Sequence, residues 1–374
     1  MLYNNPTLLI EHLHLTDVRN IAHCDIEPSP GMNFLYGKNG QGKTNLVEAI
    51  HFLATLDFHR GQADDFIRRG ASRAVISARV EVDGLHRNIE ITLEGKRRAV
   101  LVDGDPVRRV KDYLGRVLAV AFFPEDMQIL LMEPSLRRQW LDKLLTLYHL
   151  PYRDTLTKAK KALDNRNRLL REPAPTQPAL FQSVEGVLAP LAADIIVRRR
   201  EMLTILDNKL KEIYQRDFGC AGEPLLNYEP SFNKAAAMGK DDIAESYRTA
   251  LAAHRERDIA AGTTLVGPHR DDFSLALDAK AVRTLASRGQ VRAALFSLNL
   301  AKIDILREKY GLDPIVILDD ILSELDSDMR RKVLLSLPKG SQVFITSTEK
   351  EYNIRDVDNN LACYKVEEGG IIAD

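Results

Sequence analysis

Alternation of hydrophobic and polar positions marks the first third of the chain and predicts β-strands. Residues 8–36 are predicted to form a strand, a turn and a second strand, with a further short apolar strand at 32–36. Residues 74–105 contain three alternating runs, and each run is followed by an Asp-Gly or Glu-Gly turn. Such turns between alternating runs are typical of an antiparallel meander.

Helical spacing of apolar positions replaces this alternation from Ser135 to about residue 260, with breaks, one of them at the proline-rich residues 173–178. This region predicts a helical insertion that is far too short for a long coiled-coil arm. A later run, 315–318, is wholly apolar, and a second run, 342–348, has an apolar centre and is interpreted as another buried strand. Such runs are typical of strands in a parallel sheet that is covered on both faces, so an α/β fold is expected.

Residues 37–44 match the phosphate-binding pattern G-x-x-x-x-G-K-[ST]. A short apolar run precedes the pattern, and a run with helical spacing follows it, which is the context that a P-loop requires. Glycines let backbone N–H groups approach phosphate oxygens, and the following helix directs its positive end to the same place. The pattern predicts that Lys43 contacts the β/γ phosphates and that the Thr44 hydroxyl ligates Mg²⁺. The predicted nucleotide-binding residues here are Gly37, Lys38, Asn39, Gly40, Gln41, Gly42, Lys43, Thr44 and Asn45.

The apolar run at 315–318 ends in two carboxylates, Asp319 and Asp320. An acid at the carboxyl end of such a strand can hold Mg²⁺ beside the P-loop threonine, which predicts Thr44 and Asp319 as metal ligands. Asp320 is placed to polarise the attacking water. The predicted catalytic residues are therefore Lys43, Asp319 and Asp320. Arg19, in an earlier turn, is interpreted either as a solvated turn residue or as a further residue near the phosphates.

A second motif precedes the predicted strand at 315–318. Ser287-x-Gly289-Gln290 stands before a run with helical spacing and resembles the signature motif of ABC-type ATPases. In those ATPases the serine hydroxyl, the glycine N–H and the helix N-terminus bind the γ-phosphate of ATP held by a second subunit. Residues 323–326 resemble the D-loop of the same ATPases, and Thr346 or Thr348 stands where transporter ATPases carry a switch histidine.

Taken together, these motifs resemble the RecF family, bacterial recombination-mediator ATPases related to SMC-type heads. The matching segments cover most of the chain and comprise residues 19–20, 37–50, 124–126, 134–138, 267–272, 287–290 and 318–326. The resemblance implies an α/β fold: an ABC-type, SMC-like P-loop ATPase head with an antiparallel meander and an inserted α-helical domain. The head is expected at residues 1–125 and 265–374, and the helical insertion, lobe II, at 126–264.

The same resemblance implies a function. It predicts an ATP-dependent DNA-binding protein of recombinational repair, replication-fork maintenance and the SOS response to DNA damage, with weak, DNA-stimulated ATP hydrolysis. An ATP-induced homodimer would clamp duplex DNA near single-strand gaps and junctions, help to load recombination mediators, and be released by hydrolysis. The implied cofactors are ATP and Mg²⁺, and the implied partners are DNA and the mediator protein RecR. Two alternatives are the energy subunit of a membrane transporter and a long-armed chromosome-organising or nuclease-partner ATPase.

Composition narrows this interpretation only slightly. The 374 residues carry a net charge of −1, so any basic DNA-binding surface has to be local. The three cysteines are far apart and form no C-x-x-C pair, which favours a reducing compartment without a zinc or disulfide framework. We see neither a signal peptide nor a stretch of about 18 apolar residues, so we expect no membrane contact and a cytoplasmic, nucleoid-associated protein.

Two polar features have two interpretations each. Arg and Lys runs in the helical region, including residues 158–171 and 198–200, are either solvated helix faces or a phosphate-contacting surface. The Gly267–Asp272 segment, with His269 and Arg270, is either a site or a turn with satisfied polar groups.

Overall fold

A computed structural model describes residues 8–125, 133–172, 178–219, 221–232, 239–278, 280–281, 288–348 and 361–374. The chain forms two compact units. Unit 1 contains residues 1–127, 216–219 and 296–374, and unit 2 contains residues 128–215 and 220–295.

Unit 1 is built on a parallel sheet whose strands come from distant parts of the chain. Its strand order is β15-β14-β3-β13-β12-β8, with only β15 antiparallel to its neighbour. The strands are β3 (Met32–Tyr36), β8 (Ala119–Phe122), β12 (Ile315–Asp319), β13 (Val343–Ser347), β14 (Leu361–Glu367) and β15 (Gly370–Ala373). Every residue of β8, β12 and β13 is buried, which confirms that the apolar runs at 315–318 and 342–348 form central strands.

A second, antiparallel sheet in unit 1 contains the predicted meander. Its order is β2-β1-β4-β5-β6-β7. The strands are β1 (Leu8–Val18), β2 (Ile21–Ile26), β4 (Ala74–Val82), β5 (Leu85–Glu94), β6 (Arg97–Val102) and β7 (Asp105–Pro106). Asp83-Gly84 and Asp103-Gly104 both have two successive positive φ angles, as two-residue hairpin turns require.

Helix α1 (Lys43–Thr55) packs between these sheets, against β1 on one side and β8, β12 and β13 on the other. The buried side chains of the helix and of both sheets form one hydrophobic cluster. Unit 1 also contains two shorter helices, α2 (Ala63–Phe66) and α9 (Ser327–Ser336), and the part of α8 (Arg288–Tyr310) from Phe296 onward. Because α1 is clamped from both sides, the loop that precedes it has a rigid support.

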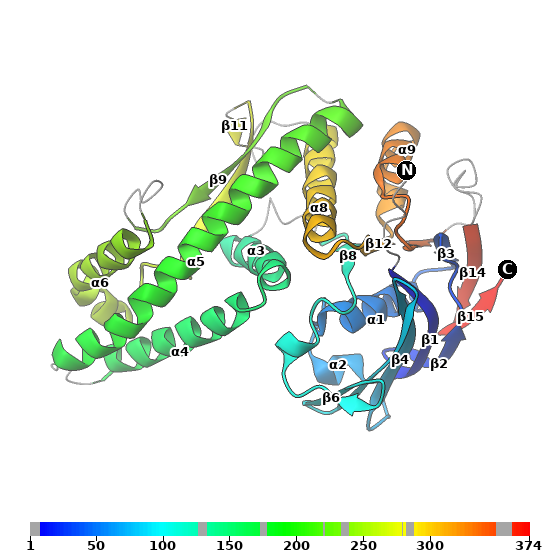
Figure 1. Ribbon diagram of the computed structural model, residues 1–374, viewed down its shortest axis with the longest axis horizontal. Helices are drawn as coiled ribbons and strands as arrows, with labels where there is room; N and C mark the ends of the chain where they lie inside the picture. The colour runs from blue at the N-terminus through cyan, green and yellow to red at the C-terminus, as the bar shows by residue number, and fades with distance from the viewer. Residues whose placement is uncertain are drawn as a thin grey trace. The chain divides into compact units, whose positions relative to one another are not determined.

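Unit 2 is mainly helical, as the sequence predicts, and Figure 1 shows α4 running along the long helix α5. Its helices are α3 (Pro134–Tyr148), α4 (Tyr152–Leu170), α5 (Pro178–Ile213) and α6 (Lys240–Ala261), and a small sheet joins β9 (Pro224–Glu229), β10 (Asp272–Leu277) and β11 (Lys280–Ala281). Arg166 on α4 is fully buried between Glu185 on α5 and Asp258 on α6, at 2.9 and 2.7 Å. An ion network therefore ties the three helices together.

The boundary between the compact units differs from the expected domain boundary near residue 265. Strand β10 pairs with β9, and the chain returns to unit 1 only at Phe296, inside helix α8 (Arg288–Tyr310). The described residues 265–278 and 288–295 therefore belong to the helical unit, because β10 completes the sheet that β9 begins. The first boundary, between residues 127 and 128, lies close to the expected one.

Among the described residues, one helical stretch, Pro178–Phe218, is long and apolar enough to cross a membrane by length and composition alone. This finding differs from the expectation that the chain has no such stretch. The apolar side chains of α5, including Leu188, Ala192 and Ile196, are buried against those of α6 within unit 2. Core helices pass the same test, so the stretch is weak support for a membrane span.

Candidate active site

The P-loop lies between β3 and α1 in unit 1, and its backbone requires glycine at two positions. Gly37 has φ 153°, and an added Cβ would lie 2.3 Å from the carbonyl oxygen of Val366. Gly42 has φ 115°, and an added Cβ would lie 2.9 Å from Asn20 Oδ1. The Gly37 contact is with backbone and excludes any side chain, and the positive φ of both residues disfavours every residue other than glycine.

Lys43 begins α1 and is almost fully buried. Its ammonium donates hydrogen bonds to the carbonyl oxygens of Gly37, at 2.6 Å, and Lys38, at 2.9 Å. Burial lowers the pKa of Lys43, and the nearby carboxylates of Asp320 and Asp319 act in the opposite direction. The ammonium is thus held inside the loop, while Lys38, Asn39 and Gly40 at its tip are exposed.

Three residues from separate elements meet at the ends of β12 and β13. The Thr44 hydroxyl donates to Asp319 Oδ1 at 3.0 Å, and the Thr346 hydroxyl donates to the same oxygen at 2.6 Å. Burial raises the pKa of Asp319, whereas the hydrogen bonds from Thr346 and Thr44 lower it. Hydroxyl and carboxylate oxygens are the donors that Mg²⁺ prefers, so Thr44 and Asp319 fit the metal-ligand pair predicted from sequence.

Asp320 follows in a strained conformation. Its φ is 51°, in the left-handed region, and its backbone N–H donates to Thr346 Oγ1 at 2.9 Å. Its Oδ1 atom is buried and has no hydrogen-bond partner in the described part of the chain. A buried, unpaired carboxylate oxygen is costly unless it serves a bound group, and it stands one residue beyond the predicted metal ligand.

The loop is also supported from outside. Gln41 accepts hydrogen bonds from the backbone N–H of Glu368, at 2.6 Å to Oε1, and of Gly369, at 2.8 Å to its carbonyl. Asn20 donates to the Gly40 carbonyl at 3.3 Å and accepts from Asn45 Nδ2 at 2.7 Å. Sequence reasoning assigned no role to Asn20, although its position beside Arg19 in the turn before the P-loop was a signal for one.

Arg19 lies in the same turn, and its guanidinium contacts residues of the segment after α1 and of α1 itself. It donates to the carbonyl oxygens of Asp65, at 3.0 Å, and Arg60, at 2.7 Å, and lies 3.2 Å from Glu48 Oε2. The side chain is therefore not a solvated turn residue. A phosphate contact by Arg19 stays a prediction.

The signature motif falls in unit 2, and Ser287 lies outside the described residues. Gly289 and Gln290 stand in the first turn of α8; Gly289 is exposed, and Gln290 Nε2 donates to the Ala221 carbonyl at 3.0 Å. In unit 1, the D-loop-like segment forms a 3₁₀ turn at Ile321–Glu324, after which Asp326 caps α9 by accepting from Met329 N at 2.8 Å. Gly289 and Gln290 of the signature motif thus stand at a helix start, as the sequence predicts.

The Gly267–Asp272 segment is a turn whose polar groups are largely satisfied. Asp271 is fully buried and accepts from Tyr228 and from Ser231 N, while Asp272 pairs with Arg137. His269 contacts the Thr264 carbonyl at 3.0 Å. This favours the structural interpretation, although Arg270 is exposed.

Two arginines of the basic runs, Arg166 and Arg199, are buried in the core of unit 2. Arg199 is buried and pairs with both carboxylate oxygens of Asp142, as Arg166 pairs with its two acids. Neither guanidinium is therefore available to a phosphate-contacting surface.

Three features together define an ABC-type ATPase head with the SMC-like arrangement. The P-loop helix lies between a parallel and an antiparallel sheet, an acid pair faces the loop, and a helical unit is inserted in the sequence between the two halves of the head. The family model "RecF/RecN/SMC N terminal domain" matches residues 9–371. The chain belongs to the RecF family. This membership confirms the predicted fold class.

Individual relatives match this chain over nearly its whole length. A "DNA replication and repair protein RecF" from Geotalea daltonii is 32% identical over 366 residues, which cover 97% of this chain and 99% of that one. A solved structure described as "recombination mediator protein RecF-ATPrS in RecFOR pathway" has a TM-score of 0.89 at 28% identity and 99% coverage of both chains. An Smc head domain from Pyrococcus furiosus, at 14% identity and a TM-score of 0.53, shares the fold alone.

Proposed function

We propose that this chain binds ATP with Mg²⁺ at the P-loop and hydrolyses the γ-phosphate bond as a DNA-repair ATPase. The observation that carries the proposal is a row of hydrogen bonds beside Lys43 that links Thr44, Asp319, Thr346 and Asp320. This row ends in the Oδ1 atom of Asp320, which is buried and has no partner among the described residues. Solved RecF relatives are described with ATP and with an ATP analogue, which supports ATP as the nucleotide.

Each of these site residues has a distinct role in the proposed reaction. Lys43 exchanges its two loop carbonyls for phosphate oxygens, which neutralises charge as ATP enters. Thr44 and Asp319 hold Mg²⁺, which supplies charge neutralisation on the phosphates when bound. Asp320 accepts a hydrogen bond from the attacking water through its free oxygen and orients it. Thr346 fixes both acids from a neighbouring strand.

Two copies of the chain complete the site in this proposal. Ser287, Gly289 and Gln290, the signature motif of one copy, would contact the γ-phosphate held by the P-loop of the other. Exposure of Gly289 supports this role, because a backbone N–H that serves a partner has to be accessible. ATP binding therefore drives formation of a homodimer, and hydrolysis releases it.

DNA and a mediator protein are the proposed partners. Relatives are described as DNA replication and repair proteins and as a recombination mediator in the RecFOR pathway, which supports a RecR-type partner. We propose that the ATP-bound dimer clamps duplex DNA near junctions with single strands, that DNA stimulates hydrolysis, and that the protein acts in the cytoplasm at the nucleoid. With a net charge near zero, the contacts have to come from a local basic surface.

The test is the molar mass in solution with and without ATP and Mg²⁺, repeated with duplex DNA. We expect the mass to double only with ATP, and the Asp320→Asn variant to form a longer-lived dimer because it hydrolyses slowly. Asp328→Asn, an exposed acid on α9, is the matched control and should behave as wild type. A monomer under every condition would refute the composite site, and a duplex affinity that does not fall with salt would refute the DNA clamp.

A further inference from the structure

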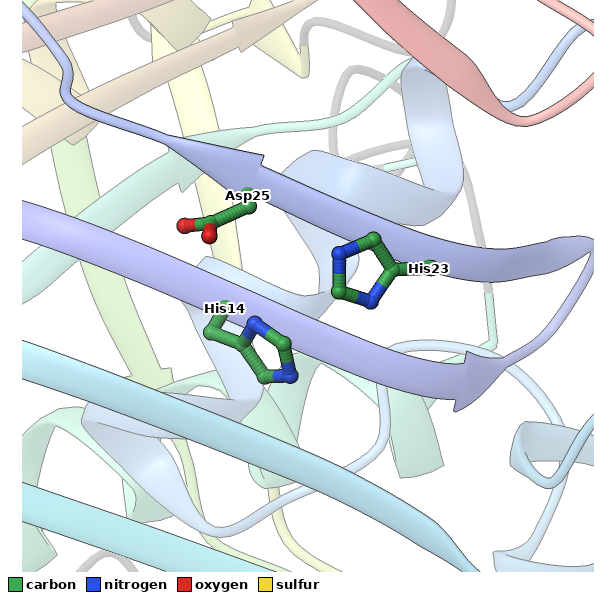
Figure 2. A group of neighbouring side chains, drawn as sticks. All are labelled: His14, His23 and Asp25. Carbon is green, nitrogen blue, oxygen red and sulfur yellow. The ribbon is translucent and has the colours of Figure 1, made fainter.

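The exposed face of the β1–β2 hairpin carries a cluster of imidazole and carboxylate side chains that have no part in the proposed ATPase site. His14 on β1 pairs in register with Asp25 on β2, and Thr16 pairs with His23. The alternate residues Leu13 and Leu15 are fully buried, so His14 and Thr16 share the opposite, outer face. Figure 2 shows the side chains of His14, His23 and Asp25 gathered over the two neighbouring strands.

Their geometry suits a metal ion. One possible ligand atom from each of His14, His23 and Asp25 lies within 4.8 Å of the other two. The two imidazole rings meet edge to face, with centroids 4.8 Å apart. Small side-chain rotations bring such atoms to the metal–ligand distances of about 2.0–2.2 Å that zinc requires.

Outer hydrogen bonds already orient two of these three ligands. His14 Nε2 lies 3.0 Å from the Thr16 hydroxyl, which leaves Nδ1 as the ligand atom of that ring. Asp25 contacts His12, the preceding outward residue on β1. Ligands of metal sites are typically held in this way by a second layer of partners, and a chance group of exposed side chains does not require one.

The surrounding charges are compatible with a cation. Arg79 on β4 is the register partner of His12, but its guanidinium is engaged by Glu11, with Nε and Oε2 3.0 Å apart. The cluster itself offers one carboxylate and two imidazoles as possible ligands of a cation.

We propose that His14, His23 and Asp25 form a binding site for a divalent first-row transition metal, with Zn²⁺ as the expected ion. Two imidazoles and one carboxylate favour zinc over Mg²⁺, which prefers oxygen ligands. Three protein ligands leave a coordination position open to water. The site is separate from the Mg²⁺ pair Thr44 and Asp319, and it does not depend on the proposed ATPase function.

A metal here would join the two strands of the hairpin whose turn supports the P-loop. The pair Thr16–His23 is followed by Val18–Ile21 and then by the turn, where Asn20 contacts Gly40 and Asn45. Bridging the strands by a metal restricts their relative motion and so slows opening of this hairpin.

The test is calorimetric titration of the full, untagged chain with Zn²⁺ at pH 7.5, without nucleotide and with excess Mg²⁺. We expect one Zn²⁺ per chain, and a loss of affinity of at least about 100-fold in His14→Ala and in His23→Ala, because each removes a ligand. His12→Ala, which removes only the outer partner of Asp25, should lose about 10-fold. Amide exchange in residues 8–26 should slow with Zn²⁺ in the wild type and not in His14→Ala or His23→Ala.

The matched control is His86→Ala. His86 belongs to a second group on the same sheet, with Glu11 and Glu81, and should leave zinc binding unchanged. These residues lie at the surface, so circular dichroism without metal should show all variants folded. Absence of stoichiometric zinc binding in the wild type would overturn the proposal, as would unchanged affinity in both His14→Ala and His23→Ala, or loss confined to His86→Ala.

Discussion

Thr346→Val removes one hydroxyl from the centre of the site while keeping the shape of the side chain. That hydroxyl donates to Asp319 Oδ1 at 2.6 Å and accepts from the backbone N–H of Asp320 at 2.9 Å, and Thr346 is 1% exposed. Losing a hydrogen bond to a charged group costs about 1.5–3 kcal/mol, and leaving a buried N–H unpaired costs about 1–3 kcal/mol. We therefore expect unit 1 to lose about 3–5 kcal/mol of local stability.

The assay compares amide hydrogen exchange of peptides from β12 and β13, which should become at least about 100-fold faster in Thr346→Val, since every 1.4 kcal/mol is tenfold. ATP turnover should fall in parallel, because Asp319 and Asp320 lose the group that orients them. The loss also raises the pKa of Asp319 further, so turnover should fall more steeply as the pH is lowered.

Thr346→Ser is the matched control, because it keeps the hydroxyl and removes only a methyl group, worth about 1 kcal/mol. If the valine and serine variants show equal exchange rates and equal turnover, the bridging role of the Thr346 hydroxyl is wrong.

The remaining predictions concern both units. Lys43→Ala should abolish tight ATP binding, measured by nucleotide titration, because it deletes the ammonium in the loop; Lys96→Ala, in the exposed turn between β5 and β6, is the comparison and should bind. Arg166→Met should cost about 3–5 kcal/mol in urea unfolding of unit 2, since it leaves the buried Asp258 without a cationic partner and Glu185 with Arg255 alone; a loss below 1 kcal/mol, about the value of an exposed pair, would contradict this. Burial lowers the pKa of His269, so between that lowered pKa and about 6.5 the unfolded chain binds more protons. Stability should therefore fall as the pH drops through this window, and His269→Gln should flatten the dependence; an unchanged slope would exclude His269 as its source.

Local sequence features predicted the conformation of most of the candidate nucleotide site because each has a short-range physical cause. The glycines of the P-loop, the helical spacing after it and the apolar strand ending in Asp319 and Asp320 each specify their own conformation. The rule that parallel strands end at the same edge then brought Thr44 and Asp319 together across the sequence. Thr346 was noted only as a substitute for a histidine, because its bond to Asp319 depends on β13 lying beside β12.

Side-chain partners far apart in sequence could not be predicted. The basic runs contain Arg166 and Arg199 without any mark that distinguishes them from exposed arginines, and only the packing of α4, α5 and α6 buries the first of them. The assignment of residues 265–295 to unit 2 was likewise not predictable from local sequence. Their sequence signals a strand and a helix start, but the choice of unit depends on the pairing of β10 with β9.

By itself, the sequence determined the class of the protein, the phosphate loop, the acid pair and the meander, since these depend on backbone preferences and on hydrophobic periods of a few residues. Tertiary structure alone decided which hydroxyl bridges the two acids, which arginines are buried and which imidazoles face one carboxylate on the β1–β2 hairpin. His12, His14, His23 and Asp25 alternate visibly along the chain, yet only the strand register sets His14 opposite Asp25. Contacts of this kind depend on the relative position of elements, which short-range propensities do not encode.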